Sequence, residues 1–312
     1  MFKNQRYYPE GWIIDSSDNK KAIFSPTTLA EAKTKEEILE ANVIMCDADH
    51  NMIVDLGCMR GIIPRCDGAI GIDTGSVRDI ALITRVGKPV SFIVKEICTD
   101  RYGKLFARLS RKEAQEHCLD YIVSEKSLGS VIDARITHLE TFGAFCDIGC
   151  GVIALLPIDA MSVSRISHPK DRFSVGDDLR VIIKSIDSNK RITLTHKELL
   201  GTWEENAREF SEGQTVSGIV RSVENYGVFI ELSPNLAGLA EPKECAYVGM
   251  TAGVYIKSII KEKMKVKLII IDCFEGDYSR PTKYFFDGDY MSFWQYSPIE
   301  CTKNIYTDFL QQ

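Results

Sequence analysis

Two short aromatic clusters are the residues of this sequence whose types and spacing could do chemistry. Phe142 and Phe145 flank a Gly-Ala pair, and Tyr226 and Phe229 flank a Gly-Val pair in the same way. An exposed ring can stack on any nucleobase, because every base has a π-face, and each such contact contributes roughly 1–3 kcal/mol. Two rings three residues apart across a glycine bend can lie on neighbouring strands and receive adjacent bases, with the backbone left clear.

A row of cations follows the second cluster. The lysines all fall on odd-numbered positions of this segment, at Lys257, Lys261, Lys263, Lys265 and Lys267, so that they alternate with other residues. Such a row could track the phosphates of a single strand, and each phosphate neutralised would add about 0.7 to the salt dependence of binding. Two other interpretations stay open: the lysines could protect an edge strand from aggregation, and an outward phenylalanine could seal an interface between domains.

An internal repeat positions these residues. The segment from Gly129 to Phe145 superimposes on the segment from Gly213 to Phe229 with a shift of 84 residues. In both copies a glycine is followed thirteen residues later by an aromatic residue, and then by Gly-x-Phe. A repeat of this kind predicts two copies of one folded unit.

Period-two alternation predicts strands in each copy. Ala144, Cys146 and Ile148 form one inward set, and Val228, Ile230 and Leu232 form the other. Phe145 and Phe229 then fall on the outer face, which otherwise carries acids. Five short strands in about seventy residues, separated by turn signals, favour a small Greek-key barrel of the OB type. The fold class is therefore all-β, with tandem five-stranded barrels joined by short helical linkers such as the one after Thr202.

A weaker third copy lies upstream. Residues 52–57 match residues 144–149, and residues 104–112 fit the final strand. At its two aromatic positions this copy has His50 and Ile53. The expected division is an N-terminal extension (1–32) that adds strands to the first barrel, a degenerate barrel (33–118), a second barrel (127–198), a helical linker (199–211), a third barrel (212–275) and an aromatic tail (276–312) with a hairpin about Asp287-Gly288.

Several motifs of the second copy together resemble the S1 RNA-binding domain. They are Phe-Gly-Ala-Phe145, Leu-Leu-Pro157, the Gly-Asp-Asp ending at 178, Ile-Asp187 and Arg-Ile-Thr-Leu194 with Lys197. The Trp203-Glu linker before Glu212-Gly213 resembles the joint between successive domains of bacterial ribosomal protein S1. The resemblance covers roughly residues 35–275, and in the first copy it depends on barrel landmarks only.

The resemblance implies single-stranded RNA bound on the outer face of the second and third strands. In the second repeat the implied contacts are Phe142, Phe145, Asp187 and Arg191, with Pro157 in place of a frequent histidine. In the third repeat Tyr226 and Phe229 match the rings, Glu241 replaces the histidine, and Lys261 and Lys265 replace the acid and the arginine. Arg191 could also simply pair with Asp187 across its turn. His138, His168 and His196 are expected to be ordinary surface or loop residues.

Composition narrows the functional classes. The net charge of −6 argues mildly against a duplex-DNA binder, and the ten scattered cysteines are expected to be reduced thiols and not zinc ligands. No motif of a catalytic site appears, and the flanks leave little room for one, so we expect no enzyme and no cofactor. We expect a cytoplasmic monomer, without membrane association, that binds messenger RNA and associates with the small ribosomal subunit. The alternative is an adaptor that docks on the ribosome or an RNA-processing complex with little RNA affinity of its own.

Overall fold

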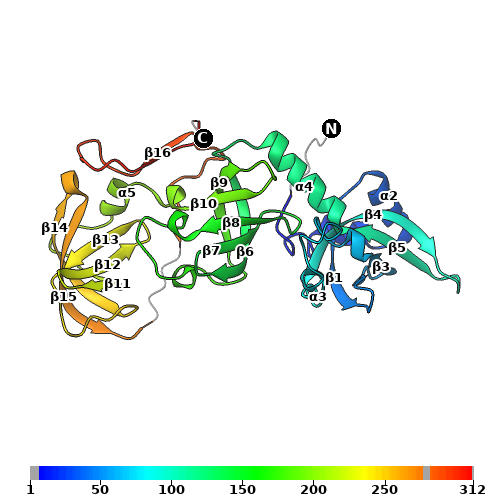
Figure 1. Cartoon of the computed structure of the whole chain (residues 1–312), viewed down its shortest axis with the longest axis horizontal. Helices are drawn as coiled ribbons and strands as arrows, with labels where there is room; N and C mark the ends of the chain where they lie inside the picture. The colour runs from blue at the N-terminus through cyan, green and yellow to red at the C-terminus, as the bar shows by residue number, and fades with distance from the viewer. Residues whose placement is uncertain (1–6, 277–281, 311–312) are drawn as a thin grey trace. The chain divides into compact units, whose positions relative to one another are not determined.

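The computed structural model describes residues 7–276 and 282–310, and it contains three closed five-stranded barrels in succession (Figure 1). In every barrel the first two strands are neighbours, antiparallel in the first and third barrels, and the third strand runs parallel to the fifth. Strands dominate, and the helices are few and mostly short. The all-β class and the tandem barrels predicted from the sequence are confirmed.

The first barrel closes in the strand order β1-β2-β3-β5-β4. Its core is lined by alternate residues of these strands, among them Val43, Val54, Phe92 and Leu109, which are fully or almost fully buried. The strands are β1 (Leu39–Cys46), β2 (Met52–Asp55), β3 (Arg60–Ile63), β4 (Pro89–Thr99) and β5 (Leu105–Ser110), and the short helix α3 (Ile80–Ile83) lies between β3 and β4.

The N-terminal extension adds helices to this barrel, and within its described residues (7–32) the expectation of extra strands is wrong. Residues 7–32 contain α1 (Ser17–Ala22), and α2 (Pro26–Thr34) begins there. The physical reason lies in the caps: Ser16 accepts a hydrogen bond from the backbone of Asn19, and Ser25 forms a reciprocal capping box with Thr28. Proline at the first position of α2 strengthens its start.

The last strand of the first barrel is shorter than expected. It ends at Ser110, whose side chain accepts a hydrogen bond from the backbone of Glu113 and so starts helix α4 (Arg111–Glu125). Residues 111 and 112, assigned to the strand from the sequence, therefore belong to the helix. The mixed polar and apolar composition of this segment gave little periodic signal for it.

The second and third barrels share one topology. The second has β6 (Val131–Glu140), β7 (Gly143–Asp147), β8 (Ile153–Pro157), β9 (Asp178–Ile186) and β10 (Ile192–Thr195). The third has β11 (Thr215–Glu224), β12 (Gly227–Ser233), β13 (Leu236–Ala240), β14 (Thr251–Ile260) and β15 (Lys265–Phe274). The predicted inward sets are buried: Ala144, Cys146 and Ile148 in the second barrel, and Val228, Ile230 and Leu232 in the third.

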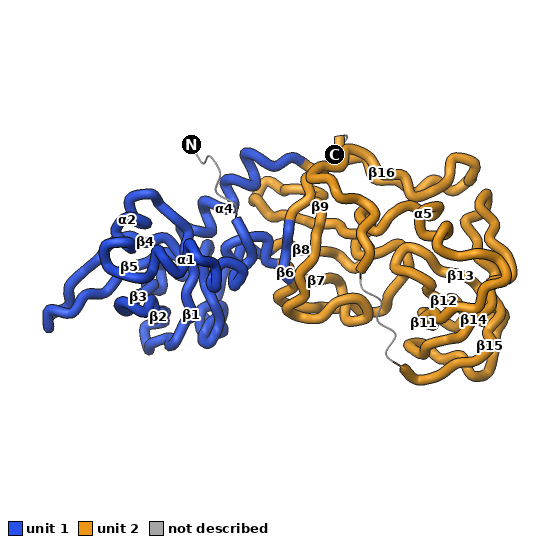
Figure 2. The backbone as a smooth tube through the Cα atoms, turned by 180° about the vertical axis from the view of Figure 1, so that it is seen from behind, with its two compact units in different colours: residues 1–127, 133–135, 147–153 blue, residues 128–132, 136–146, 154–312 orange. Residues whose placement is uncertain are grey.

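The chain forms two compact units, coloured separately in Figure 2. One comprises residues 1–127, 133–135 and 147–153, and the other comprises residues 128–132, 136–146 and 154–312. Most of the second barrel, the whole third barrel and the tail therefore belong to the same unit. This unit carries both aromatic clusters.

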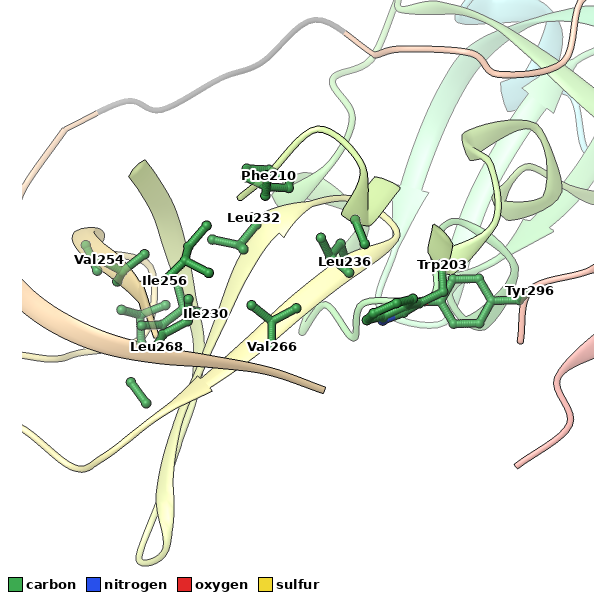
Figure 3. Close-up of a cluster of buried hydrophobic side chains, with 14 of the residues drawn as sticks. Trp203, Phe210, Ile230, Leu232, Leu236, Val254, Ile256, Val266, Leu268 and Tyr296 are labelled. Atoms are coloured by element: carbon green, nitrogen blue, oxygen red, sulfur yellow. The ribbon is translucent and has the colours of Figure 1, made fainter. Parts of the chain in front are cut away.

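A linker helix joins the second and third barrels within this unit. Helix α5 (Trp203–Ala207) begins at the predicted N-cap, Thr202, which forms a capping box with Glu205. Trp203 is 3% exposed and packs beside Tyr296 of the tail, next to the apolar core of the third barrel (Figure 3). The backbone N–H of Trp203 donates to the carbonyl of Tyr296 at 3.1 Å. Linker and tail are therefore part of one continuous core.

The C-terminal tail contains a hairpin, but not at Asp287-Gly288. Its two strands are β16 (Phe293–Gln295) and β17 (Tyr306–Asp308), while residues 284–288 contain no strand. Arg180 of β9 donates to the carbonyls of Phe286 and Gly288 and holds that stretch along the second barrel. Trp294 and Tyr296 pack in the core, whereas Phe293 remains 48% exposed.

His196 is not the surface residue that the sequence suggested. It is fully buried after β10, where one ring nitrogen hydrogen-bonds the carbonyl of Met161 and the ring contacts Phe173 and Tyr284 edge-on. Burial lowers the pKa of His196 to about 4, so the ring is neutral in the fold near neutral pH. The tail residue Tyr284, far away in sequence, completes this site.

None of the described helices is long and apolar enough to cross a membrane.

Candidate nucleic-acid interface

The two ring pairs have nearly the same geometry in the second and third barrels. The Phe142 and Phe145 centroids lie 6.0 Å apart at an interplanar angle of 88°, and those of Tyr226 and Phe229 lie 6.1 Å apart at 87°. Phe142 is 54% exposed and Tyr226 is 70% exposed, while the second ring of each pair is half-buried. An edge-to-face pair fixes both rings in place, and one face of the outer ring stays in water.

The glycine between the rings has a packing role. A Cβ on Gly143 would lie 2.6 Å from the carbonyl oxygen of Leu156, and a Cβ on Gly227 would lie 2.8 Å from that of Ala240. These carbonyls belong to β8 and β13, the third strands of the two barrels. The glycine therefore lets the ring-bearing strand approach its neighbour, and it positions the rings by this contact.

We expect Gly227→Ala to destabilise the third barrel by about 1–3 kcal/mol, because an added methyl group would overlap backbone atoms that cannot move away freely. The measurement is the free energy of unfolding by denaturant. Gly253→Ala in β14 is the matched control, since its Cβ would meet only a carbonyl oxygen at 3.9 Å. Equal stability of the two variants would contradict this role.

His138 extends the aromatic surface of the second barrel. Its ring stacks on Phe145 with centroids 6.3 Å apart and an interplanar angle of 25°, and its Nε2 lies 2.7 Å from a carboxylate oxygen of Glu140. In the third barrel the equivalent residue is Ser222, which lies opposite Phe229 after a register shift in β11. The sequence prediction treated His138 as an ordinary surface residue and missed this contact.

The acids on the same outer strand face do not stand in water. Glu231 is 4% exposed and accepts hydrogen bonds from Arg172 at 2.7 and 3.0 Å and from Arg221 at 2.9 and 3.2 Å. Burial alone would raise the pKa of Glu231, but the two guanidinium groups hold it below its ordinary value. Since Arg172 follows a loop of the second barrel, Glu231 ties the two barrels together.

Asp147 holds the corresponding position in the second barrel and is also buried. Its carboxylate accepts hydrogen bonds from the backbone N–H groups of Glu10, Gly149 and Gly151. Burial raises the pKa of Asp147 to about 7. The outer strand face is thus divided: the rings remain accessible, and the acids serve packing.

Asp187 and Arg191, predicted as an acid and a base for RNA, lie at the exposed turn between β9 and β10. The side chain of Asp187 accepts hydrogen bonds from the backbone N–H groups of Asn189 and Arg191, both at 2.8 Å. Asp187 therefore builds the turn. The Arg191 side chain is exposed beside it.

The two lysines predicted for the third barrel have different surroundings. Lys261 Nζ lies 2.6 Å from Glu204 of the linker and 3.6 Å from Glu300 of the tail, and the hydrogen bond to Glu204 raises its pKa. Lys265 is exposed on β15 and lines a groove. Lys261 does not line that groove.

This groove, with a volume of about 1130 Å³, runs over the outer face of the third barrel. The ring pair Tyr226 and Phe229 lies in it, together with residues 237–243 and 263–270. Its charged side chains are one glutamate, Glu241, and six lysines: Lys243, Lys257, Lys263, Lys265, Lys267 and Lys303. A groove this basic in a chain with a net charge of −6 concentrates positive potential where the rings stand.

Strand pairing places Lys267 in line with Phe229, the inner ring of the pair, across the neighbouring strands. Phe229 pairs with Leu239 of β13, and Leu239 pairs with Lys267 of β15. Neighbouring strands are about 4.8 Å apart, so the ammonium stem begins about 10 Å from the base of the ring. In the second barrel Thr193 pairs with Leu155 at the equivalent place. The third barrel therefore offers stacking and charge together, and the second mainly stacking.

The first barrel has no equivalent ring pair. Ile53 is 8% exposed, and His50 Nε2 lies 3.8 Å from a carboxylate oxygen of Asp79. The two positions that carry rings in the other barrels are therefore occupied by a buried isoleucine and by an imidazole near a carboxylate.

Successive closed five-stranded barrels, two of them with an exposed ring pair at the start of the second strand, define a tandem OB-type barrel protein. Residues 125–197, which span the second barrel, match the family model of the S1 RNA binding domain. The chain is an S1-domain protein, distantly related to ribosomal protein bS1.

The curated relatives to which the chain is similar are named as small ribosomal subunit proteins. Small ribosomal subunit protein bS1 of Staphylococcus aureus (strain COL) is 31% identical over 248 residues, which are 78% of this chain and 61% of that protein. The protein of the same name from Staphylococcus haemolyticus is 29% identical over 78% of this chain and 60% of its own length. The chain thus spans about three fifths of the length of these relatives.

Solved structures with similar parts include a multidomain protein with nucleic acid binding domains from Streptococcus pneumoniae. It is 15% identical and covers 75% of this chain and 73% of its own, with a TM-score of 0.25. GSP13 from Bacillus subtilis is 27% identical over 22% of this chain and 54% of its own, with a TM-score of 0.21. Both TM-scores are low, and the family assignment depends on sequence similarity.

Proposed function

We propose that this chain binds single-stranded RNA on the outer faces of its second and third barrels, and that it acts in translation by holding messenger RNA at the small ribosomal subunit. The observation that supports this most is the pair of accessible, edge-to-face rings repeated in both barrels. The kinship with bS1 supports the ribosomal setting. We also propose that the chain works in the cytoplasm as a monomer and without catalysis.

The contacts assigned to RNA follow from the surroundings of each predicted residue. Phe142, Phe145, Tyr226 and Phe229 stack on bases, with His138 beside the second-barrel pair. Arg191 and Lys265 meet phosphates. Asp187 supports its turn, and Lys261 holds the linker and the tail, so we assign both a structural role.

Recognition by stacking predicts a shallow sequence preference. Each base offers a similar π-face, and in a duplex those faces are occupied by their neighbours. We expect unstructured strands of different sequence to bind with similar affinity.

The first barrel is the proposed anchor, because its two ring positions hold a buried isoleucine and a histidine beside Asp79. In this division of labour, Phe145→Ala with Phe229→Ala should weaken binding of an unstructured oligonucleotide at least tenfold. His50→Ala with Ile53→Val should change it less than twofold. The conservative Ile53→Val is chosen because a buried isoleucine tolerates loss of one methyl group at a cost of about 0.5–1.5 kcal/mol.

The measurement is the fluorescence anisotropy of a labelled oligo-U titrated with each full-length variant. Equal weakening by both pairs would overturn the division of labour. If neither pair changes RNA affinity while association with small ribosomal subunits persists, the protein is a docking adaptor and the proposed function fails.

A further inference from the structure

The groove of the third barrel has a second wall that the barrel does not supply. Besides β13 and β15 it is lined by Trp203 of the linker and by Tyr296, Lys303 and Ile305 of the C-terminal tail, with Val163 and Ser164 from a loop of the second barrel. All of these residues belong to the same compact unit. The groove therefore extends beyond the ring-bearing strands to the tail.

The tail wall is held in a fixed place. The hydroxyl of Tyr296 donates to the carbonyl of Asn235 at 2.6 Å, and its backbone N–H donates to the carbonyl of Ile305 at 2.9 Å. Thr307 donates to the buried carboxylate of Glu198 at 2.8 Å. Lys303 lies in the short connection between these anchored positions, so its place beside the groove follows from the fold of the tail hairpin.

The far wall offers charge and not stacking. Trp203 and Tyr296 are only 3% and 5% exposed, so their rings cannot sandwich a base. Lys303 is exposed at the groove. The tail therefore presents one exposed ammonium group, that of Lys303, to a ligand in the groove.

Lys303 is available for a ligand. Within the described part of the chain no carboxylate lies within 4.0 Å of its Nζ, and the same holds for Lys257, Lys263, Lys265 and Lys267. Lys243 differs, because its Nζ donates to the carbonyls of Ile270 and Ile271. Lysines gathered in a groove without carboxylate partners repel one another, and a polyanion relieves that repulsion.

We propose that RNA bound on Tyr226 and Phe229 continues across β15 to the C-terminal tail, where Lys303 neutralises a backbone phosphate. This inference rests on the proposed function and adds to it a site contributed by a segment outside the S1 barrels. The tail then has two roles: it fastens the second and third barrels together, and it lengthens the RNA path of the third.

The test compares short and long probes on the full-length chain. OB folds occupy about 4 to 16 nucleotides, so oligo-U of about 4 nucleotides covers the ring pair and one of about 16 also reaches the tail. We expect Lys303→Gln to reduce the slope of log affinity against log salt by about 0.7 for the long probe, because one phosphate contact is lost. The short probe should bind as before, and Lys303→Arg should restore the slope.

Lys170→Gln is the matched control, since it removes one exposed lysine of the same unit that does not line the groove. Its slope should equal that of the unaltered chain. An unchanged slope in Lys303→Gln, or an equal loss with both probes, would overturn the tail site. Loss of affinity for both probes in Tyr226→Ala with Phe229→Ala shows that the proposed function stands even then. If that ring variant binds both probes normally, the third barrel is not an RNA site, and that part of the proposed function has failed.

Discussion

Replacing Tyr226 and Phe229 together by alanine is expected to lower the affinity for unstructured RNA by about 100-fold or more. Each stacked base contributes about 1–3 kcal/mol, and the third barrel is where stacking and lysines coincide. The two rings touch edge-to-face at 6.1 Å, so each also fixes the position of the other. The loss in the double variant should therefore differ from the sum of the single losses, as expected for residues in contact.

The measurement is a double-mutant cycle by anisotropy with Tyr226→Ala, Phe229→Ala and the double variant. Tyr247→Ala is the matched control, because Tyr247 is a 66% exposed tyrosine of the same barrel that does not line the groove. It should bind as the unaltered chain does. A double variant with the affinity of this control would exclude the third barrel as the RNA site.

Replacing Glu231 by alanine is expected to destabilise the unit that contains the second and third barrels by about 3–5 kcal/mol. The substitution leaves two guanidinium groups without their carboxylate, and the side chains of Arg172 and Arg221 are only 8% and 11% exposed. Loss of one partner from a buried ion pair strands the other charge in a medium of low dielectric constant, which is the costly case. Unfolding by urea measures the effect.

The same ion pairs predict a pH dependence. The folded-state pKa of Glu231 lies below its ordinary value of 4.5, so its stabilising contribution is complete above pH 4.5 and is lost as the pH falls through the folded-state pKa. The stability difference between the unaltered chain and Glu231→Ala should thus be constant near neutrality and shrink in acid. Glu224→Gln, at an exposed acid of the same barrel, should show neither effect. A difference that grows towards acid would contradict the assignment.

Local patterns in the sequence were sufficient to predict the barrels and the face of the strands on which the rings lie. Period-two alternation predicted which residues of β7 and β12 are buried, and the repeated spacing predicted that Phe145 and Phe229 share one environment. Both predictions depend on contacts within one strand pair, where the side-chain period decides the outcome.

The period-two alternation could not reveal that the acids on the outward side of the strands are buried. Glu231 points away from its own core, as alternation predicts, but Arg172 reaches it from a distant loop. The predictions for His196 and for the tail hairpin were wrong for the same reason. His196 contacts Tyr284, and Arg180 binds the carbonyl of Phe286, and both pairs are about a hundred residues apart in sequence. A single sequence has no local signal for such partners.

The position of one residue of the candidate site, beside the inner ring, depends on a register shift in the first strand of the barrel. In β11 a register shift between Val220 and Ser222 brings Ser222 opposite Phe229. A bulge of this kind reverses inward and outward positions beyond it, so simple alternation cannot place the equivalent His138 beside Phe145. The lysines were predicted as one row, yet Lys261 pairs with Glu204 of the linker while Lys265 and Lys267 line the groove. Contacts with the packed linker and tail distinguish Lys261 from the lysines of the groove.

The most direct test of RNA binding by stacking is a titration of the full-length chain with poly-U and with duplex RNA of equal length, at a low and a high salt concentration. Charge contacts weaken with salt for both ligands, whereas stacking on unpaired bases is far less sensitive. Binding by stacking predicts tighter binding of poly-U at both salt concentrations, with the preference kept or enlarged at high salt. Equal binding of the two RNAs, or a preference for poly-U that disappears at high salt, would contradict it.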